Sequence, residues 1–275
     1  MRATGNHSRP ADSIPGTVRK AIWLGLILTL ISHLGAQINT EALRREDQTH
    51  GWHPSLGADL GVIAGNSSLL SVKGNLRLDY RGAKAYGFAV SQYQQGRKDD
   101  DLFINKGFAH LRGIAILRPK LHLEGFLQRE FNDFIKLQDR RLVGGGLRFL
   151  FPGPTGEKPV PIRINLGTGL MWEQERLDLV NGAADPAGTN LLRSTNYIVL
   201  RWLPEGPLNI YTTAYYQVDT RSFSDYRITW EGGLTLALTK RIALTISGNL
   251  RYDHEPPPGV KTYDLDLTNG LILQF

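Results

Sequence analysis

The sequence predicts an all-β protein, a transmembrane antiparallel up-and-down β-barrel of about twelve strands. Three observations indicate this fold. Apolar and polar residues alternate with a period of two from Trp52 to the C-terminus, which is typical of strands with two different faces. The alternating segments are long enough to cross a bilayer, and aromatic residues gather near their ends.

The alternation is clearest in residues 242–253, where Ile242, Leu244 and Ile246 alternate with small or polar residues. Most of these segments reach the ~9–11 tilted residues that cross a bilayer and exceed the ~5–6 of soluble strands. Counting such segments between turn signals gives twelve expected strands, at residues 53–64, 69–80, 84–95, 102–116, 120–131, 138–151, 162–176, 191–203, 208–219, 225–238, 242–253 and 262–275.

Aromatic residues on the expected outward face form two bands, as at the two interfaces of a membrane barrel. One band lies near the strand ends that face the periplasm, and the other lies near the outer ends. The first comprises Tyr80, Tyr86, Phe151, Trp202 and Phe275, and the second Phe103, Phe131, Trp172, Tyr216, Tyr226, Tyr252 and Tyr263. Phe275, with Leu271 and Leu273 on its face, resembles the terminal signal that the barrel-assembly machinery reads.

The N-terminus is expected to be an export signal. Arg19 and Lys20 precede about a dozen apolar residues, too few for a membrane-spanning helix but typical of a signal peptide. We therefore expect a signal peptide at residues 1–36, a short periplasmic segment at 37–51 with helix-forming residues, and the barrel at 52–275. The expected location is a Gram-negative outer membrane, reached through the periplasm, and the absence of cysteine suits that route.

Charged side chains lie on the face opposite the apolar stripe, where a barrel has its lumen. Buried charges need partners, and a three-residue turn at 117–119 predicts Arg112 opposite Glu124. Other expected pairs are Glu130 with Arg140, Glu173 or Glu175 with Arg193, Asp219 with Arg227, and Arg251 with Asp264 or Asp266. The predicted lumen charge network is Lys73, Arg77, Arg112, Glu124, Glu130, Arg140, Glu173, Glu175, Arg193, Arg227, Glu231, Arg251, Asp264 and Asp266. Such a network either braces the wall or lines an ion path.

Three stretches of the sequence, residues 65–68, 126–133 and 251–264, are similar to the salt-induced outer-membrane protein family, the YdiY-like barrels. The likeness extends over roughly residues 50–275. It implies an outer-membrane location and brings no catalytic residues, because the family is itself a domain of unknown function.

No motif points to catalysis, a cofactor or a metal. His110 and His122 are the only histidines inside expected strands, and the predicted turn pairs them with Phe126 and Ile114, too far apart to share an ion. Asp99–Asp101 reads as a solvated loop or as a cation contact at the lipopolysaccharide surface. Gly144–Gly146 lacks the Lys-Ser/Thr of a phosphate loop and is expected to permit curvature instead.

Two functions remain open. One is a narrow passive channel for small polar or ionic solutes. The other is a non-conducting structural barrel, associated with salt or osmotic stress, whose lumen is plugged by charged side chains. The expected partners are outer-membrane lipid, lipopolysaccharide and the barrel-assembly machinery. Residues 37–275 hold 28 Lys/Arg against 25 Asp/Glu with no basic cluster, so no nucleic-acid partner is expected.

Overall fold

The computed structural model of this chain describes residues 40–41, 43–45, 49–63, 68–98, 101–152, 161–179, 188–239 and 241–273. The chain divides into two units, Met1–His33 and Leu34–Phe275, and all the described residues belong to the second. The predicted export signal and Phe275 lie outside the described residues.

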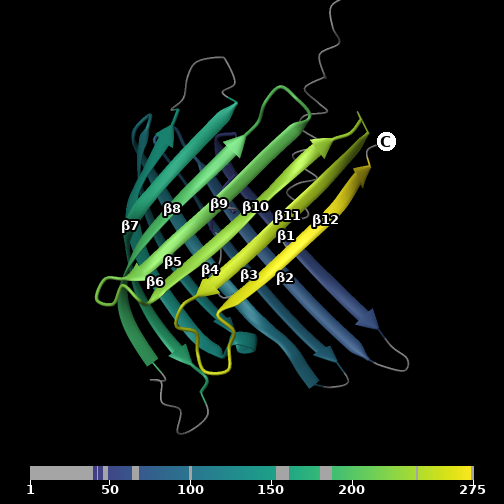
Figure 1. Cartoon of the computed structure of the whole chain (residues 1–275), viewed down its shortest axis with the longest axis vertical. Helices are drawn as coiled ribbons and strands as arrows, with labels where there is room; N and C mark the ends of the chain where they lie inside the picture. The colour runs from purple at the N-terminus through teal and green to yellow at the C-terminus, as the bar shows by residue number, and fades with distance from the viewer. Residues whose placement is uncertain are drawn as a thin grey trace, which may run out of the picture. The chain divides into compact units, whose positions relative to one another are not determined.

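All twelve predicted strands are confirmed, and they form one antiparallel sheet in chain order from β1 to β12 (Figure 1). A short 3-10 helix, η1 (Asp133–Ile135), follows β5. The strands are β1 (Gly51–Ile63), β2 (Leu69–Arg81), β3 (Ala85–Lys98), β4 (Asp101–Arg118), β5 (Leu121–Asn132), β6 (Leu137–Phe151), β7 (Ile162–Leu177), β8 (Gly188–Trp202), β9 (Leu208–Asp219), β10 (Tyr226–Ala237), β11 (Ile242–Asp253) and β12 (Tyr263–Leu273).

Because each strand pairs with its neighbours in the chain, β1 and β12 are the two edge strands of the sheet. The connections fall alternately at two ends. We call the end that carries residues 82–84, 119–120 and 203–207 the turn end, and the end that carries residues 133–136, 220–225 and 254–262 the loop end.

The sheet is polar inside and apolar outside, the reverse of a soluble domain. Leu56 and Leu60 are 81% and 71% exposed, whereas Arg148 and Glu173 are each 1% exposed. More charged and polar side chains than apolar ones are buried among the described residues. A soluble protein rarely exposes many large apolar side chains or buries many charged ones. This sheet does both.

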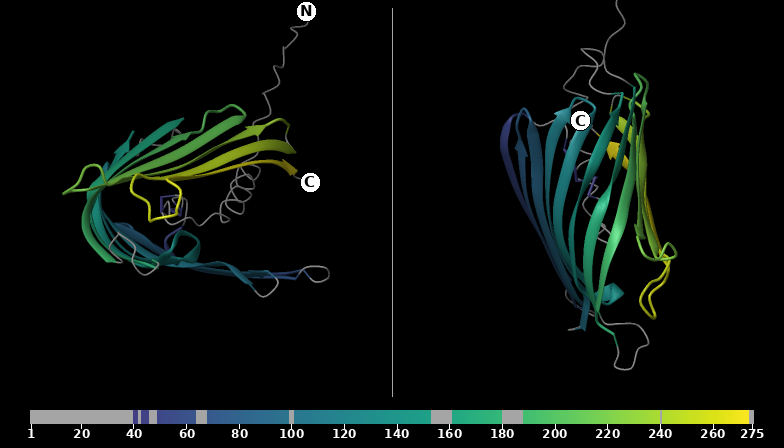
Figure 2. Two further views of the ribbon diagram at one scale, coloured as in Figure 1. Left: turned by 60° about the horizontal axis from the view of Figure 1, so that its bottom comes forward. Right: turned by 90° about the vertical axis from the view of Figure 1, so that its left-hand side faces the viewer.

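The sheet curves strongly, so that its two halves face each other across an interior (Figure 2). Glycines occupy matching positions on four adjacent strands, with Gly87 opposite Gly113, Gly113 opposite Gly125, and Gly125 opposite Gly145. On the next pair of strands, a Cβ at Gly146 or Gly169 would collide with the facing backbone. Close backbone approach is the role expected for glycine in a bent strand.

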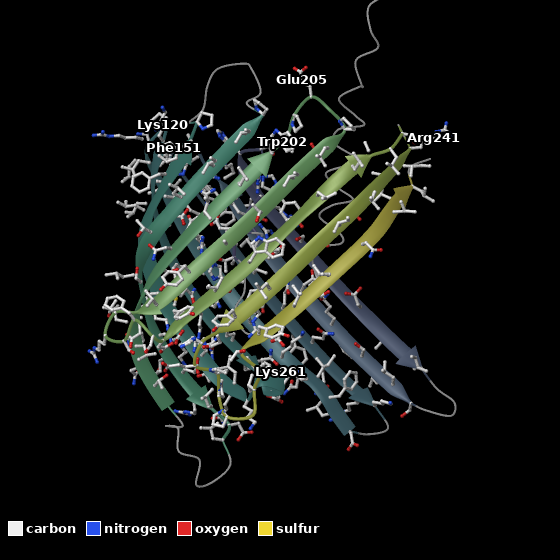
Figure 3. All side chains as sticks on the ribbon, in the orientation of Figure 1. Lys120, Phe151, Trp202, Glu205, Arg241 and Lys261 are labelled. Atoms are coloured by element: carbon white, nitrogen blue, oxygen red, sulfur yellow. The ribbon has the colours of Figure 1, made fainter. Side chains whose placement is uncertain are left out.

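Aromatic side chains lie at both ends of the outer face. Phe151 and Trp202 lie toward the turn end with Lys120 and Glu205, and Lys261 lies at the opposite end (Figure 3). The placement of Tyr86 on the outward face was wrong. Tyr86 is buried, because β3 turns an aromatic and aliphatic row inward and Tyr86 belongs to that row. No helix among the described residues is long and apolar enough to span a membrane.

Candidate functional site in the sheet interior

Charged side chains of the inner face gather in two clusters, one toward each end of the sheet. The turn-end cluster joins wall residues to the inner segment, by which we mean residues 40, 41 and 43–45; it comprises Glu41, Arg44, Arg112, Glu124 and Arg148. The described members of the loop-end cluster all belong to strands of the wall, and they are Glu130, Arg140, Glu173, Glu175, Arg193 and Arg227.

Apolar and polar contacts together hold the inner segment against the wall. Leu43 packs on a buried cluster formed by Phe88, Val90 and Phe108 of β3 and β4. On the other side of the interior, the hydroxyl of Thr40 lies 3.3 Å from that of Tyr215 on β9. The segment therefore touches strands on both halves of the curved sheet.

The carboxylate of Glu41 is the centre of the turn-end cluster. Arg112 Nη1 donates to its Oε1 at 2.7 Å, and Arg148 Nη1 donates to its Oε2. Arg44 donates to both oxygens, from Nη2 at 2.8 Å and from Nε at 3.1 Å. Three guanidinium groups thus surround one carboxylate that is itself buried, and charge-assisted bonds of this kind are the strong ones.

The electrostatics of Glu41 follow from this geometry. Burial raises the pKa of its carboxyl, but the positive charges of Arg148, Arg44 and Arg112 lower it by more. The net effect is a pKa below the ordinary value, so Glu41 is ionised at neutral pH.

Glu124 of β5 is the second carboxylate of this cluster. Its Oε1 accepts from Arg44 Nη2 at 2.7 Å, and its Oε2 accepts from the hydroxyl of Tyr197 at 2.9 Å. Arg112 Nη1 lies 3.4 Å from the same Oε2. Since Tyr197 belongs to β8, these bonds cross the interior from one part of the wall to another.

The loop-end cluster has the same plan, with Glu173 of β7 at its centre. Arg193 Nε donates to Glu173 at 3.0 Å, and Arg227 Nη1 donates to it at 2.9 Å. Arg140 Nε donates to Glu175 at 2.7 Å, and Arg140 Nη1 donates to Glu130 at 2.8 Å. Arg227 lies on β10, three strands from β7, so this cluster also crosses the interior.

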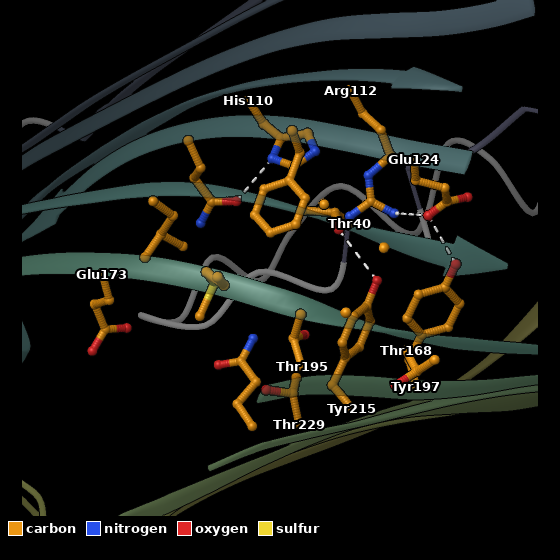
Figure 4. Close-up of a pocket in the computed structure, with 18 of the residues that line it drawn as sticks. Thr40, His110, Arg112, Glu124, Thr168, Glu173, Thr195, Tyr197, Tyr215 and Thr229 are labelled. Carbon is orange, nitrogen blue, oxygen red and sulfur yellow. Dashed lines mark hydrogen bonds and ion pairs between the residues drawn. The ribbon is translucent and has the colours of Figure 1, made fainter. Parts of the chain in front are cut away.

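Between the clusters lies a cavity of about 50 Å³ (Figure 4). It is lined by His110, Arg112, Tyr197 and Tyr215 toward one side and by Glu173 and Arg227 toward the other. A polar cavity of this size holds a few water molecules. Solvent can therefore occupy part of the interior.

The predicted register of the β4–β5 hairpin was wrong by two residues. Arg112 is opposite Phe126, and Glu124 is opposite Ile114, because the turn is Pro119–Lys120 and the strands are irregular between Ile116 and Arg118. The two side chains nevertheless meet diagonally, at 3.4 Å. The same shift places His110 opposite Gln128 and His122 opposite Ile116.

Most of the other predicted charges are also brought together. Arg193 contacts Glu173, and Arg251 lies 3.2 Å from Asp264. The expected pairing of Asp219 with Arg227 was wrong, because the register sets Gln217 opposite Arg227. Arg227 donates instead to Asp253 at 2.8 Å.

The remaining predicted charges lie elsewhere on the inner face. Arg77 donates to Asp79 at 2.6 Å on its own strand, and Lys73 is opposite Asp59. Glu231 is opposite Thr213, and Asp266 is opposite Asn249.

The two histidines considered for catalysis or metal binding each lie within hydrogen-bond distance of a neighbouring side chain. His110 Nδ1 lies 2.9 Å from Gln128 Oε1, and His122 Nδ1 lies 3.3 Å from the hydroxyl of Tyr86. Among the described residues, no group of three or more His, Asp or Glu is placed to hold a metal ion. Asp99 and Asp100 lie outside the described residues.

Sequence reasoning missed Thr40, Glu41 and Arg44. These residues lie outside the alternating strands, so no periodicity marks them as facing the interior. A signal existed in the wall, since Arg112 and Arg148 face inward beside Glu124, the one wall carboxylate that the described residues place in this cluster. Two buried arginines of this kind indicate that a further carboxylate can approach them.

These features define a class, an up-and-down antiparallel sheet of twelve strands with a charged interior, the arrangement from which β-barrels are built. The chain belongs to the family described as "Protein of unknown function, DUF481", whose model matches residues 58–275. This agrees with the resemblance to the YdiY-like barrels.

Other comparisons add little. No curated protein matches the chain. A solved structure entitled "NanC porin structure in rhombohedral crystal form" is similar to it, with 7% identity and a TM-score of 0.44. That match covers 80% of this chain and 100% of the other.

Proposed function

We propose that the protein is an outer-membrane β-barrel that forms a narrow channel for small polar or ionic solutes, closed at rest by the inner segment. The observation that carries this proposal is the reversal of polarity across the sheet. A wall with leucines outside and ion pairs inside suits a lipid exterior and a lumen that admits water and ions.

The outer face supports the membrane location. A sheet in lipid must satisfy every backbone group internally, which requires long strands and closure of β1 on β12. The described strands have 11–18 residues, enough to cross a hydrocarbon core. Exposed Trp52 and Tyr80 at the turn end, and Tyr216 and Tyr263 at the loop end, fit two interfacial bands.

Export by a signal peptide fits the placement of the inner segment. Cleavage after Ala36 would begin the mature chain at Gln37, three residues before Thr40. The segment that contacts the interior would then lie next to the new N-terminus. A short chain end of this kind can leave or enter the interior without any change in the wall.

Contacts cross the interior at both ends, and those of the inner segment at the turn end support a closed resting state. The inner segment occupies the turn end through Glu41 and Leu43. At the loop end, Lys136 Nζ donates to the carbonyl of Pro258 at 2.8 Å, and Val260 packs on Ile135 and Leu137. The β11–β12 loop thus joins η1 and β6, which lie on the other half of the sheet.

The alternative is a non-conducting barrel linked to salt or osmotic stress. One observation favours it: both clusters are densely paired, and a buried network with satisfied charges can simply brace a wall. The two functions differ in whether removal of the inner segment opens a path.

Planar-bilayer recording of three mature proteins tests the proposal. One is the mature wild type, one lacks residues 38–45, and one carries Asp139→Asn as a control at an exposed ion pair near the loop end. A channel closed by the inner segment gives rare openings in the wild type and in the control, and frequent openings in the deletion variant. Silent recordings from a correctly folded deletion variant favour the non-conducting barrel.

A further inference from the structure

We propose that Arg112 and Arg148 form a binding site for the carboxylate of a small anionic solute, and that Glu41 occupies this site in the closed state. The inference rests on the proposed function for the route by which the solute arrives. The inner segment then does more than obstruct the interior, because it presents the same chemical group that the site binds.

The geometry of the wall arginines is that of a carboxylate clamp. Arg112 comes from β4 and Arg148 from β6, and each donates to a different oxygen of Glu41. Both side chains are almost fully buried. Guanidinium groups that reach one carboxylate from two directions fix its position and orientation, as a specific anion site requires.

The charge of the cluster favours an anion over a neutral solute at this point. Among the described residues, the wall part of the cluster has two arginines and one carboxylate, Glu124. The inner segment adds Glu41 and Arg44, whose charges cancel, so the described cluster is positive both with and without the segment. A carboxylate between Arg112 and Arg148 is therefore favoured over a neutral group of the same shape.

Two tyrosine hydroxyl groups and a neighbouring cavity complete the site. Tyr197 OH lies 3.3 Å from Arg148 Nη1, and Tyr215 OH contacts Thr40 of the inner segment. The cavity is lined by Arg112, by both tyrosines and by Thr40, the residue that precedes Glu41 in the chain. The remainder of a small solute can extend into this cavity, and Tyr215 can bind it once Thr40 has left.

Acetate is the probe for the test, because it is the carboxylate group of Glu41 without the rest of the side chain. Glu41→Ala in the full mature chain leaves Arg44, Arg112 and Arg148 around an empty position. We expect sodium acetate to raise the unfolding temperature of this variant in detergent by about 3 °C at roughly ten times its Kd. Acetamide and sodium chloride at the same concentration should give less than a third of that shift.

Two matched proteins show whether acetate acts at this site. The mature wild type keeps the Glu41 carboxylate between the arginines, so acetate should give it no larger shift than sodium chloride gives. Adding Arg112→Gln to Glu41→Ala removes one half of the clamp and should abolish the acetate shift. If Glu41→Ala does not stay folded, its refolding yield replaces the unfolding temperature, and acetate should raise that yield at least twofold over acetamide.

Equal effects of acetate and chloride on Glu41→Ala would overturn the inference, as would an acetate shift that persists with Arg112→Gln. Neither result depends on conductance, because the measurement is made in detergent. A protein that shows the acetate shift but never conducts has the carboxylate site and lacks the proposed channel. A protein that conducts without the shift has the channel and lacks the site.

Discussion

The guanidinium group of Arg112 lies closer to Glu41 of the inner segment than to Glu124 of the adjacent strand. Its Nη1 is 2.7 Å from Glu41 Oε1 and 3.4 Å from Glu124 Oε2. The strongest partner of this wall arginine is therefore contributed by a short segment outside the sheet. It follows that the stability of the turn end depends on this carboxylate, as does the closed state of the proposed channel.

Substitution of Glu41 should cost more than substitution of any surface carboxylate. Glu41→Gln keeps the shape of the side chain but removes the charge between three guanidinium groups. Breaking a buried pair costs about 3–5 kcal/mol where water is excluded. We expect a loss of at least ~2 kcal/mol in the free energy of unfolding, measured by urea titration in lipid vesicles.

Asp139→Asn is the control for that measurement. Asp139 pairs with Arg129 and Arg141, whose side chains are more than half exposed, so its loss should cost about 1 kcal/mol or less. Equal losses for Asp139→Asn and Glu41→Gln would show that the inner segment adds nothing to stability.

The lowered pKa of Glu41 predicts how the closed state depends on pH. A carboxyl whose folded pKa is depressed adds stability that is present above its unfolded pKa and is lost as the pH falls through its folded pKa. The loss for Glu41 therefore begins as the pH drops below the ordinary value of 4.5 and continues toward its lower folded pKa. We expect the wild type to open in bilayers only in this acidic range.

Glu41→Gln identifies which group is responsible for acid opening. Arg44, Arg112 and Arg148 surround Glu41, and Glu124 is the other described carboxylate of this cluster. The Gln variant should open at neutral pH and respond less to acid than the wild type does. Acid opening of the same size in both proteins would assign the effect to a group other than Glu41.

The loop-end cluster should contribute to stability without controlling the closed state. Glu173→Gln removes the charge between Arg193 and Arg227, and we expect an unfolding loss similar to that of Glu41→Gln. Because Glu173 belongs to the wall, the inner segment stays in place and openings at neutral pH should remain rare. Frequent openings in this variant would place the closing contact at the loop end instead.

The strands could be predicted from the sequence because each one faces two different environments along its whole length. The alternation of Ile242, Leu244 and Ile246 records that difference directly, and β11 lies where it predicts. The diagonal contact of Arg112 with Glu124 could not be predicted in its correct register. That register depends on the two-residue turn and on the irregularity after Ile116. A shift by two residues leaves every side chain on the same face, so the alternation of the sequence cannot reveal it.

The inner segment could not be predicted because its contacts are long-range. Arg44 binds Glu124, 80 positions away, and Glu41 binds Arg148, 107 positions away. No local pattern contains this information. The inward-facing arginines on β4 and β6 indicated that a further carboxylate could approach them, but not where in the chain that carboxylate lies.

Closure of the sheet can be measured directly, because the chain has no cysteine of its own. Asp59 of β1 lies opposite Lys73, and Thr268 of β12 lies opposite Ser247, so both face inward by the alternation of their strands. We expect a cysteine at Asp59 to form a disulfide with a cysteine at Asp266, Thr268 or Gly270. The pair that reacts shows the register in which β1 meets β12. Cysteines at Asp59 and Leu267 face opposite sides and are the control. A sheet whose edges stay apart forms none of these bonds.

The orientation of the barrel makes the last prediction. Lys261 and Glu205 are exposed residues at opposite ends of the sheet (Figure 3). The even number of strands puts the first and last described strand ends, Gly51 and Leu273, at the end that carries Glu205. If the chain enters from the periplasm, that end stays there. A cysteine at Lys261 should therefore react with a membrane-impermeant maleimide on intact cells, whereas one at Glu205 should react only after the outer membrane is permeabilised. The opposite labelling pattern on intact cells would mean that the barrel is inverted. The inner segment would then lie at the cell surface, where it could not close the channel from the periplasmic side.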